Sequence, residues 1–228
     1  MILEAEPHLI HAKNLRYQYG EGNMAQPVLK GASIELNSGE FVILAGPSGS
    51  GKSTFLSLIG ALRACQEGSL RVAGRDLVSA NELTMLTIRR QVGYVFQQHN
   101  LLGFLTALQN VEMALDMFPD YSQKEKITLS TEILEMVGLS DFMGHYPSQM
   151  SVGQKQRVAI ARSLVHRPKV ILADEPTASL DSKTGIKVVE LLHGMVKNMG
   201  CGALVVTHDH RIFEYADRIL HIEDGVVT

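Results

Sequence analysis

The stretch from Gly46 to Ser53 reads GPSGSGKS, and it restricts the fold more than any other part of the chain. It fits a phosphate-binding pattern of Gly, any four residues, Gly, Lys and Ser or Thr. It follows the apolar run Phe41–Ala45, and a helical pattern continues from Thr54 to Ile59. Glycines let the backbone curl so that successive N–H groups point into one concavity at the start of a helix, where phosphate oxygens bind. The stretch predicts a strand, a phosphate-binding loop and a helix that bind a nucleoside triphosphate.

Each residue of this loop is a candidate nucleotide ligand. Lys52 can reach the β- and γ-phosphates, and the Ser53 hydroxyl can bind Mg²⁺, so ATP with Mg²⁺ is the expected ligand. An ordinary glycine-rich turn is the alternative, which the strand before it and the helix after it disfavour. The candidate residues are Gly46, Pro47, Ser48, Gly49, Ser50, Gly51, Lys52, Ser53 and Thr54.

Composition indicates a folded globular protein and disfavours nucleic acid as a partner. The 228 residues are 45% hydrophobic, and the net charge is −3 with no long basic block. Cys65 and Cys201 are far apart in sequence and are expected to be reduced thiols of a cytosolic protein. The acidic start MILEAEPH does not fit a secretory leader, and no apolar run approaches about eighteen residues, the length of a membrane span.

Four short apolar runs predict buried strands, at residues 41–45, 92–96, 170–173 and 204–206. They lack clean alternation, which is typical of strands covered on both faces. Helical patterns separate them, so we expect an α/β fold with a mostly parallel core sheet and its ligand at the carboxyl ends of the strands.

Three further segments complete the expected fold. Residues 9–36 have strand-like patterns that predict a largely antiparallel layer. Helical periodicity over residues 98–168 predicts an inserted helical lobe. Asp224-Gly225 between two short apolar runs predicts a closing hairpin.

Two adjacent carboxylates end the third buried run. Alternation along a strand sends Asp174 and Glu175 in different directions, so we expect separate roles for them. Asp174 is the candidate for the Mg²⁺ shell, and Glu175 is the candidate to polarise the attacking water. The alternative is a pair of acids that cap the turn at Pro176, which the phosphate-binding loop disfavours.

A second phosphate cradle is predicted at residues 151–154. Ser151 and Gln154 have the spacing of a capping box ahead of an apolar-periodic helix. A helix N-terminus has free N–H groups and the positive end of the helix dipole, which favour phosphate.

Five motifs, in this order, resemble the ATP-binding cassette (ABC) ATPases over essentially the whole chain. They are GPSGSGKS, Gln97 after Val95-Phe96, MSVGQKQRVAIARSL, VILADEPTASLDS and VVTHDH. The resemblance implies one ABC nucleotide-binding domain over residues 1–228. Residues 1–97 and 166–228 would form a RecA-like core with a β layer, and residues 98–165 a helical lobe.

In that family two subunits close head to tail as a homodimer, and each ATP lies between the loop of one and the signature helix of the other. The resemblance therefore adds nucleotide contacts from the second copy, at Ser151, Val152, Gly153 and Gln154.

The resemblance also implies roles for single residues. Tyr19 would stack on adenine, Gln97 would join Mg²⁺, and His208 would contact the γ-phosphate. Tyr17 and Gln98 are the competing candidates for the first two roles, and any one histidine is more often a surface or core residue than a catalytic one.

By resemblance, the catalytic set has four candidates. Glu175 would be the catalytic carboxylate, with Lys52 and His208 at the γ-phosphate. Asp181 would lie in the loop that crosses the dimer interface.

One residue departs from the family pattern. The signature usually reads Leu-Ser-Gly-Gly-Gln, whereas this chain has Met150 and Val152 in place of the leucine and the first glycine. Met for Leu conserves volume, but the branched Val152 lies where the backbone approaches a phosphate. We expect the dimer to form with weaker closure or slower turnover.

Within the family, the chain is similar to the lipoprotein-releasing and macrolide-exporting (LolD/MacB-like) group. The segments RACQEGSL and HYPSQMSVGQKQRVAIARSLVHRPK resemble the DevA-type glycolipid exporter ATPases. Such ATPases lie on the inner face of the cell membrane and power a separate integral permease, often through a periplasmic adaptor and an outer-membrane channel.

Other readings are open to different degrees. A DNA-repair ATPase would need a long coiled-coil insertion or zinc hook, and this sequence has neither. A translation-factor type would need two cassettes, and this sequence has one. A cell-division-regulating ABC ATPase, which transmits force without transporting a substrate, shares nearly every motif and stays an alternative.

Overall fold

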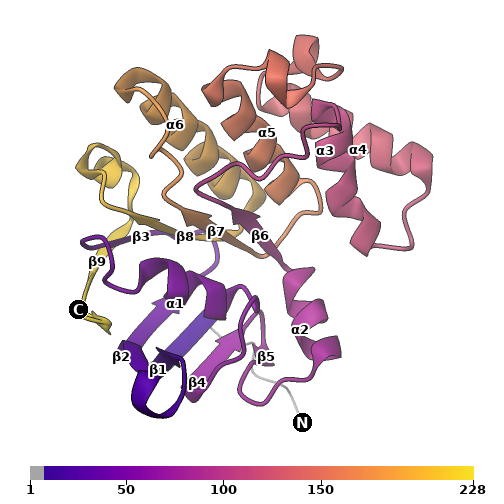
Figure 1. The fold of residues 1–228 in the computed structure, drawn as a ribbon. Helices are drawn as coiled ribbons and strands as arrows, with labels where there is room; N and C mark the ends of the chain where they lie inside the picture. Colours follow the sequence, from indigo (N-terminus) through magenta and orange to yellow (C-terminus); the bar gives the residue numbers. More distant parts are fainter. Residues whose placement is uncertain (1–7) are drawn as a thin grey trace.

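The computed structural model describes residues 8–228, which form two β-sheets with helices between and around them (Figure 1). The start MILEAEPH, which does not fit a secretory leader, lies outside the described residues except for His8. The two sheets bury separate apolar clusters, one on each face of the larger sheet.

The larger sheet has six strands in the order β10-β9-β3-β8-β7-β6. All neighbouring pairs are parallel except β9 with β10. The strands are β3 (Phe41–Ala45), β6 (Val92–Val95), β7 (Val170–Asp174), β8 (Gly202–Thr207), β9 (Arg218–Glu223) and β10 (Val226–Val227). The four predicted apolar runs are β3, β6, β7 and β8, so the predicted mostly parallel core sheet is confirmed.

Strand β3 shows why these runs lack polar alternation. Phe41 and Ile43 face the cluster that includes α5 and α6, whereas Val42 and Leu44 face α1 and the second sheet. All five residues of β3 are buried. Both faces of the strand are therefore covered, as expected for a parallel sheet.

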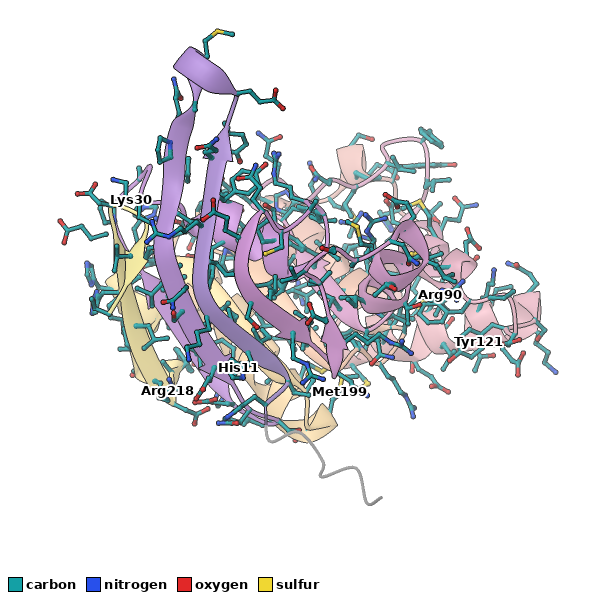
Figure 2. The ribbon with its side chains drawn as sticks, turned by 90° about the horizontal axis from the view of Figure 1, so that it is seen from below. His11, Lys30, Arg90, Tyr121, Met199 and Arg218 are labelled. Carbon is teal, nitrogen blue, oxygen red and sulfur yellow. The ribbon has the colours of Figure 1, made fainter. Side chains whose placement is uncertain are left out.

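The smaller sheet is antiparallel, with the strand order β2-β1-β4-β5. Its strands are β1 (Ile10–Tyr19), β2 (Gln26–Leu36), β4 (Glu67–Val72) and β5 (Arg75–Asp76). The antiparallel layer was predicted from residues 9–36, but β4 and β5 were not. The hairpin of β1 and β2 extends beyond the body of the protein (Figure 2).

Helix α1 (Lys52–Ile59) lies between the two sheets, and α5 (Val152–Leu164) and α6 (Ser182–Met199) cover the opposite face of the larger sheet (Figure 1). Helix α2 (Glu82–Arg89) precedes β6. Helices α3 (Ala107–Glu112) and α4 (Gln123–Met136) lie between β6 and α5 in the chain and pack with α5.

Two local predictions have different outcomes. The predicted helical region of residues 98–168 is only partly α-helical, because α3 ends at Glu112 and a 3₁₀ helix follows at Met113–Met117. The hairpin at Asp224-Gly225 is confirmed. Both residues have positive φ, 47° and 78°, as a two-residue hairpin turn requires.

Candidate nucleotide-binding site

The loop between β3 and α1 wraps around the side chain of Lys52. Its Nζ donates hydrogen bonds to the carbonyl oxygens of Gly46 at 2.7 Å and Pro47 at 2.8 Å. Gly51 caps α1 with φ of 101°, a left-handed conformation that favours glycine. At Gly46, a Cβ atom would lie 2.2 Å from the carbonyl oxygen of Ile222, so no side chain fits there. The sequence thus forms a tight loop at a helix N-terminus, which suits phosphate.

Oxygen ligands for a divalent cation meet beside this loop. The Ser53 hydroxyl donates a hydrogen bond of 3.0 Å to Oδ1 of Asp174 at the end of β7. Burial raises the pKa of Asp174, and the hydrogen bond from Ser53 partly offsets that rise. Gln97 and Ser53 line one cavity beside the loop, and Asp174 reaches it through its bond to Ser53. A hydroxyl, a carboxylate and an amide oxygen are ligands that Mg²⁺ accepts, so these residues fit the expected metal.

Glu175 does not share the partner of Asp174 but is bonded to Thr207 and His208. It has φ of 47° just after β7 ends. Its Oε1 lies 2.8 Å from Nδ1 of His208, and its Oε2 accepts a hydrogen bond of 3.2 Å from the Thr207 hydroxyl. The Glu175 side chain is 10% exposed, whereas that of His208 is 63% exposed. The expected separation of the two carboxylates is therefore present in the structure.

One cavity of about 330 Å³ collects most of the predicted residues. Its lining includes Tyr19 and Gln97 but not their competitors Tyr17 and Gln98. Val28 on β2 also lines it and was not predicted, since nothing in its local sequence distinguishes it. The lining residues are Tyr19, Val28, Ser48, Gly49, Gly51, Lys52, Ser53, Thr54, Gln97, Glu175 and His208.

Three predicted loop residues, Gly46, Pro47 and Ser50, do not line this cavity but support the loop. Gly46 and Pro47 contribute the carbonyl groups that hold Lys52. Ser50 is buried, and its carbonyl accepts a hydrogen bond of 3.2 Å from the backbone N–H of Gly225. The terminal hairpin thus supports the loop from behind.

The second phosphate cradle lies apart from this cavity. Ser151 and Gln154 form the predicted capping box at the start of α5, with bonds of 2.8 and 3.2 Å. Ser151, Gly153 and Gln154 line another cavity of about 520 Å³, between α5 and α6. Val152 is the first residue of α5 and is 43% exposed. Within one chain, the two phosphate cradles do not meet.

The start of α6 packs closely against the second cradle. A Cβ atom on Gly153 would lie 2.6 Å from Cγ2 of Thr184. The carboxylate of Asp181 accepts a hydrogen bond of 3.1 Å from the backbone N–H of Thr184 and caps α6. This bond lowers the pKa of Asp181. Asp181 does not line the nucleotide cavity; in this chain it holds the helix that Gly153 contacts.

A link between two loops was missed by sequence reasoning. The buried Thr177, which follows Glu175, donates a hydrogen bond of 3.0 Å to Asp209 Oδ2. Arg211 donates to both Asp209 oxygens at 2.7 Å and lowers the pKa of Asp209 to about 2. The only sequence signal for this link is the position of Asp209 next to His208.

Comparisons with known proteins agree with this geometry. Residues 29–178 match the ABC transporter family. The chain is 41% identical over 221 residues to the uncharacterized ABC transporter ATP-binding protein MJ1508 of Methanocaldococcus jannaschii, which covers 96% of this chain and 98% of that protein. It is 40% identical to the macrolide export ATP-binding/permease protein MacB of Escherichia coli (strain K12), over 96% of this chain. The chain spans 34% of the length of MacB.

Solved structures give the same result. The dimeric post-hydrolysis state of the ATP-binding cassette MJ0796, bound to ADP and Pi, matches with a TM-score of 0.87 and 40% identity over 96% of both chains. CbiO1 from Clostridium perfringens, part of the ABC transporter complex cbiONQ, matches with a TM-score of 0.87 and 27% identity, over 98% of this chain and 88% of CbiO1. Among residues 8–228, no helix has the length and apolar character needed to cross a bilayer.

Proposed function

The chain belongs to the ABC transporter family as an ATPase domain, and from this premise we propose that it powers export or force transmission through a separate membrane permease. Two copies would close head to tail around two ATP molecules. The observation that carries this proposal is the separation of the two phosphate cradles, which line different cavities of one chain. A second copy would bring its residues 151–154 to the cavity of the first.

Each side chain of the cavity has a role in this proposal. Lys52 would turn from the loop carbonyls to the β- and γ-phosphates. Glu175 would accept a hydrogen bond from the attacking water and orient it in line with the γ-phosphate. His208, bonded to Glu175 and largely exposed, would contact the γ-phosphate from the same side. Tyr19 would stack on the adenine.

Ser53, Asp174 and Gln97 would hold Mg²⁺. The ion they would hold would supply positive charge to offset the negative charge on the phosphates. Asp174 contributes its carboxylate only when ionised. Because burial raises its pKa, acid removes this ligand sooner than it would from an exposed aspartate.

We propose that the permease docks in a groove between the core and the helical lobe, taken as residues 98–165. A cavity of about 240 Å³ there is lined mainly by apolar groups, with Arg89 and Arg162 as its charged residues. Its lining residues are Gly60, Leu62, Arg89, Val92, Tyr94, Ala114, Met117, Arg162, Ser163 and His166. Burial lowers the pKa of His166 to about 4, so this histidine is neutral at pH 7. The groove fits a permease segment with apolar side chains and a carboxylate.

The likeness to MacB supports export as the direction and the inner face of the cell membrane as the location. A periplasmic adaptor and an outer-membrane channel would connect through the permease. Co-purification from membranes tests the partner: Leu62→Glu, within the groove, should reduce permease recovery, whereas Leu83→Glu, exposed on α2, should not. Equal recovery with both variants would contradict this docking site.

The head-to-tail dimer is tested by light scattering and ATPase assays over a range of protein concentrations. ATP should convert a Glu175→Gln variant from monomer to dimer, and the wild-type rate per subunit should rise with concentration. A variant that stays monomeric with ATP, together with a rate per subunit that does not change with concentration, would contradict the proposal.

A further inference from the structure

The ring of Tyr19 is held in place by two neighbours, Thr54 and Tyr17. Its hydroxyl shares a hydrogen bond of 3.1 Å with the Thr54 hydroxyl. The ring of Tyr17 packs against it in a T-shaped contact, with 5.1 Å between ring centroids and 79° between the ring planes. The plane of the Tyr19 ring is therefore fixed beside the phosphate-binding loop.

Arg63 covers one face of this ring. Its guanidinium carbon lies 4.9 Å from the ring centroid, within the range of a cation–π interaction. Arg63 follows α1, and its backbone N–H donates a hydrogen bond of 3.2 Å to the carbonyl of Ser57 in that helix. The arginine is thus positioned by the same helix that begins at the phosphate-binding loop.

Gln66 attaches the segment that carries Arg63 to β1. Its Oε1 accepts a hydrogen bond of 2.8 Å from the Gln18 backbone N–H, and its Nε2 donates one of 3.1 Å to the Gln18 carbonyl. Both bonds are made to the residue immediately before Tyr19. The connection between α1 and β4 therefore forms a support behind the ring.

The nucleotide cavity adjoins Tyr19 without reaching this support. Tyr19, Val28 and Thr54 line the cavity, whereas Arg63 is not among its lining residues. One ring face is thus occupied by a cation, and the ring also lines the cavity beside the phosphate-binding loop. A flat aromatic base that continues from the phosphates would meet that surface.

We propose that Arg63 is a positioning residue for the nucleotide base. By holding the Tyr19 ring from behind, it strengthens base stacking and leaves phosphate binding unchanged. This inference rests on the proposed placement of adenine on Tyr19.

Titration calorimetry with two probes tests this role. ADP presents base and phosphates, whereas inorganic pyrophosphate presents phosphates alone. Arg63→Met keeps an unbranched apolar stem and removes the charge. It should weaken ADP binding about two- to fivefold, the range of an exposed cation–π contact, and leave pyrophosphate binding unchanged. Arg75→Met on β5, an exposed arginine of the same sheet, is the matched control and should change neither affinity.

A double-mutant cycle distinguishes the role of Arg63 from the placement of adenine on Tyr19. If Tyr19→Ala weakens ADP binding, Arg63→Met should add nothing in that background. If Tyr19→Ala has no effect on ADP, the placement of the base fails, whatever Arg63 does. Three results would overturn the role of Arg63 alone: unchanged ADP affinity, equal weakening of pyrophosphate, or tighter ADP binding, which would mean that Arg63 occupies the space of the base.

Discussion

The two phosphate cradles of this chain differ in how completely one chain builds them. The loop cradle is closed on several sides. Lys52 bonds the loop, and Ser53 reaches Asp174. Glu175 is bonded by Thr207 at the end of β8 and by His208 just after it. The cradle at α5 is a capped helix start whose first residue is exposed. First-turn N–H groups of a helix have no intrahelical partner and attract anions. The difference fits the proposal that the first cradle carries catalysis and that the second completes the site of another copy.

The largest expected effect comes from the closed cradle. Glu175→Gln keeps the shape of the side chain and removes the charge that polarises water, so hydrolysis should fall about 10²- to 10⁴-fold. ADP affinity should stay close to that of the wild type, because Glu175 does not hold the phosphates. Steady-state ATPase assays and ADP titration measure both quantities.

Glu135→Gln, an exposed acid on α4, is the control for this experiment and should keep the wild-type rate. Equal rates for Glu175→Gln and wild type would remove Glu175 from catalysis. A fall in ADP affinity as large as the fall in rate would instead mean that the residue holds the loop together.

Gly153→Ala tests whether the open cradle depends on packing within its own chain. The added methyl group would meet Thr184 at 2.6 Å, and such overpacking costs about 1–3 kcal/mol of unfolding free energy. Thr184→Ala removes the opposing methyl and should restore most of that loss in Gly153→Ala. Urea unfolding of both single variants and the double variant measures the rescue.

The same variants distinguish packing from contact with a partner. If the glycine is required only for approach to the other subunit's phosphate, Gly153→Ala would unfold like wild type. Thr184→Ala would then fail to restore ATP-dependent dimerisation.

The phosphate-binding loop with β3, and the strand β4, show what the sequence could and could not predict. The loop and β3 were predictable because a glycine pattern and a continuous apolar run are local signals. Strand β4 has only Leu70 and Val72 buried among six residues, so its pattern is too weak to identify. Its pairing with β1 depends on residues more than fifty positions away.

Residues that complete the candidate site were harder to find. Val28 on β2 lines the nucleotide cavity, and Arg63 after α1 lies over the Tyr19 ring, yet neither belongs to a motif. Their placement depends on the order of strands in the antiparallel sheet, which no local pattern in the sequence encodes. The finer resemblance to glycolipid exporter ATPases stays a prediction.

A smaller effect is expected at Val152, where the chain departs from its family. If the exposed valine weakens the grip on the partner's phosphate, Val152→Gly should raise ATP-dependent dimerisation and turnover about two- to fivefold, the range of a helix N-terminus contact with an anion. Light scattering and ATPase assays measure the two quantities. Val152→Ala is the intermediate control. Unchanged turnover and dimerisation in Val152→Gly would exclude this role.

The smallest effect should come from Asp209, which joins the segment after β8 to Thr177 in the segment after β7 and is also bonded by Arg211. Its pKa is lowered to about 2 in the folded chain, against about 3.9 for an unperturbed aspartate. A lowered folded pKa contributes stability above the unfolded value, and that stability is lost as pH falls from about 4 to about 2. Asp209→Asn should therefore lower Tm by a few degrees at pH 7, about the shift that a 1 kcal/mol loss produces in a chain of this size, and the difference should shrink below about pH 4. Thermal unfolding at both pH values measures this difference. A Tm difference that stays constant from pH 7 to below pH 4 would mean that the amide disturbs the hydrogen-bond geometry. The charge of Asp209 would then contribute nothing to stability.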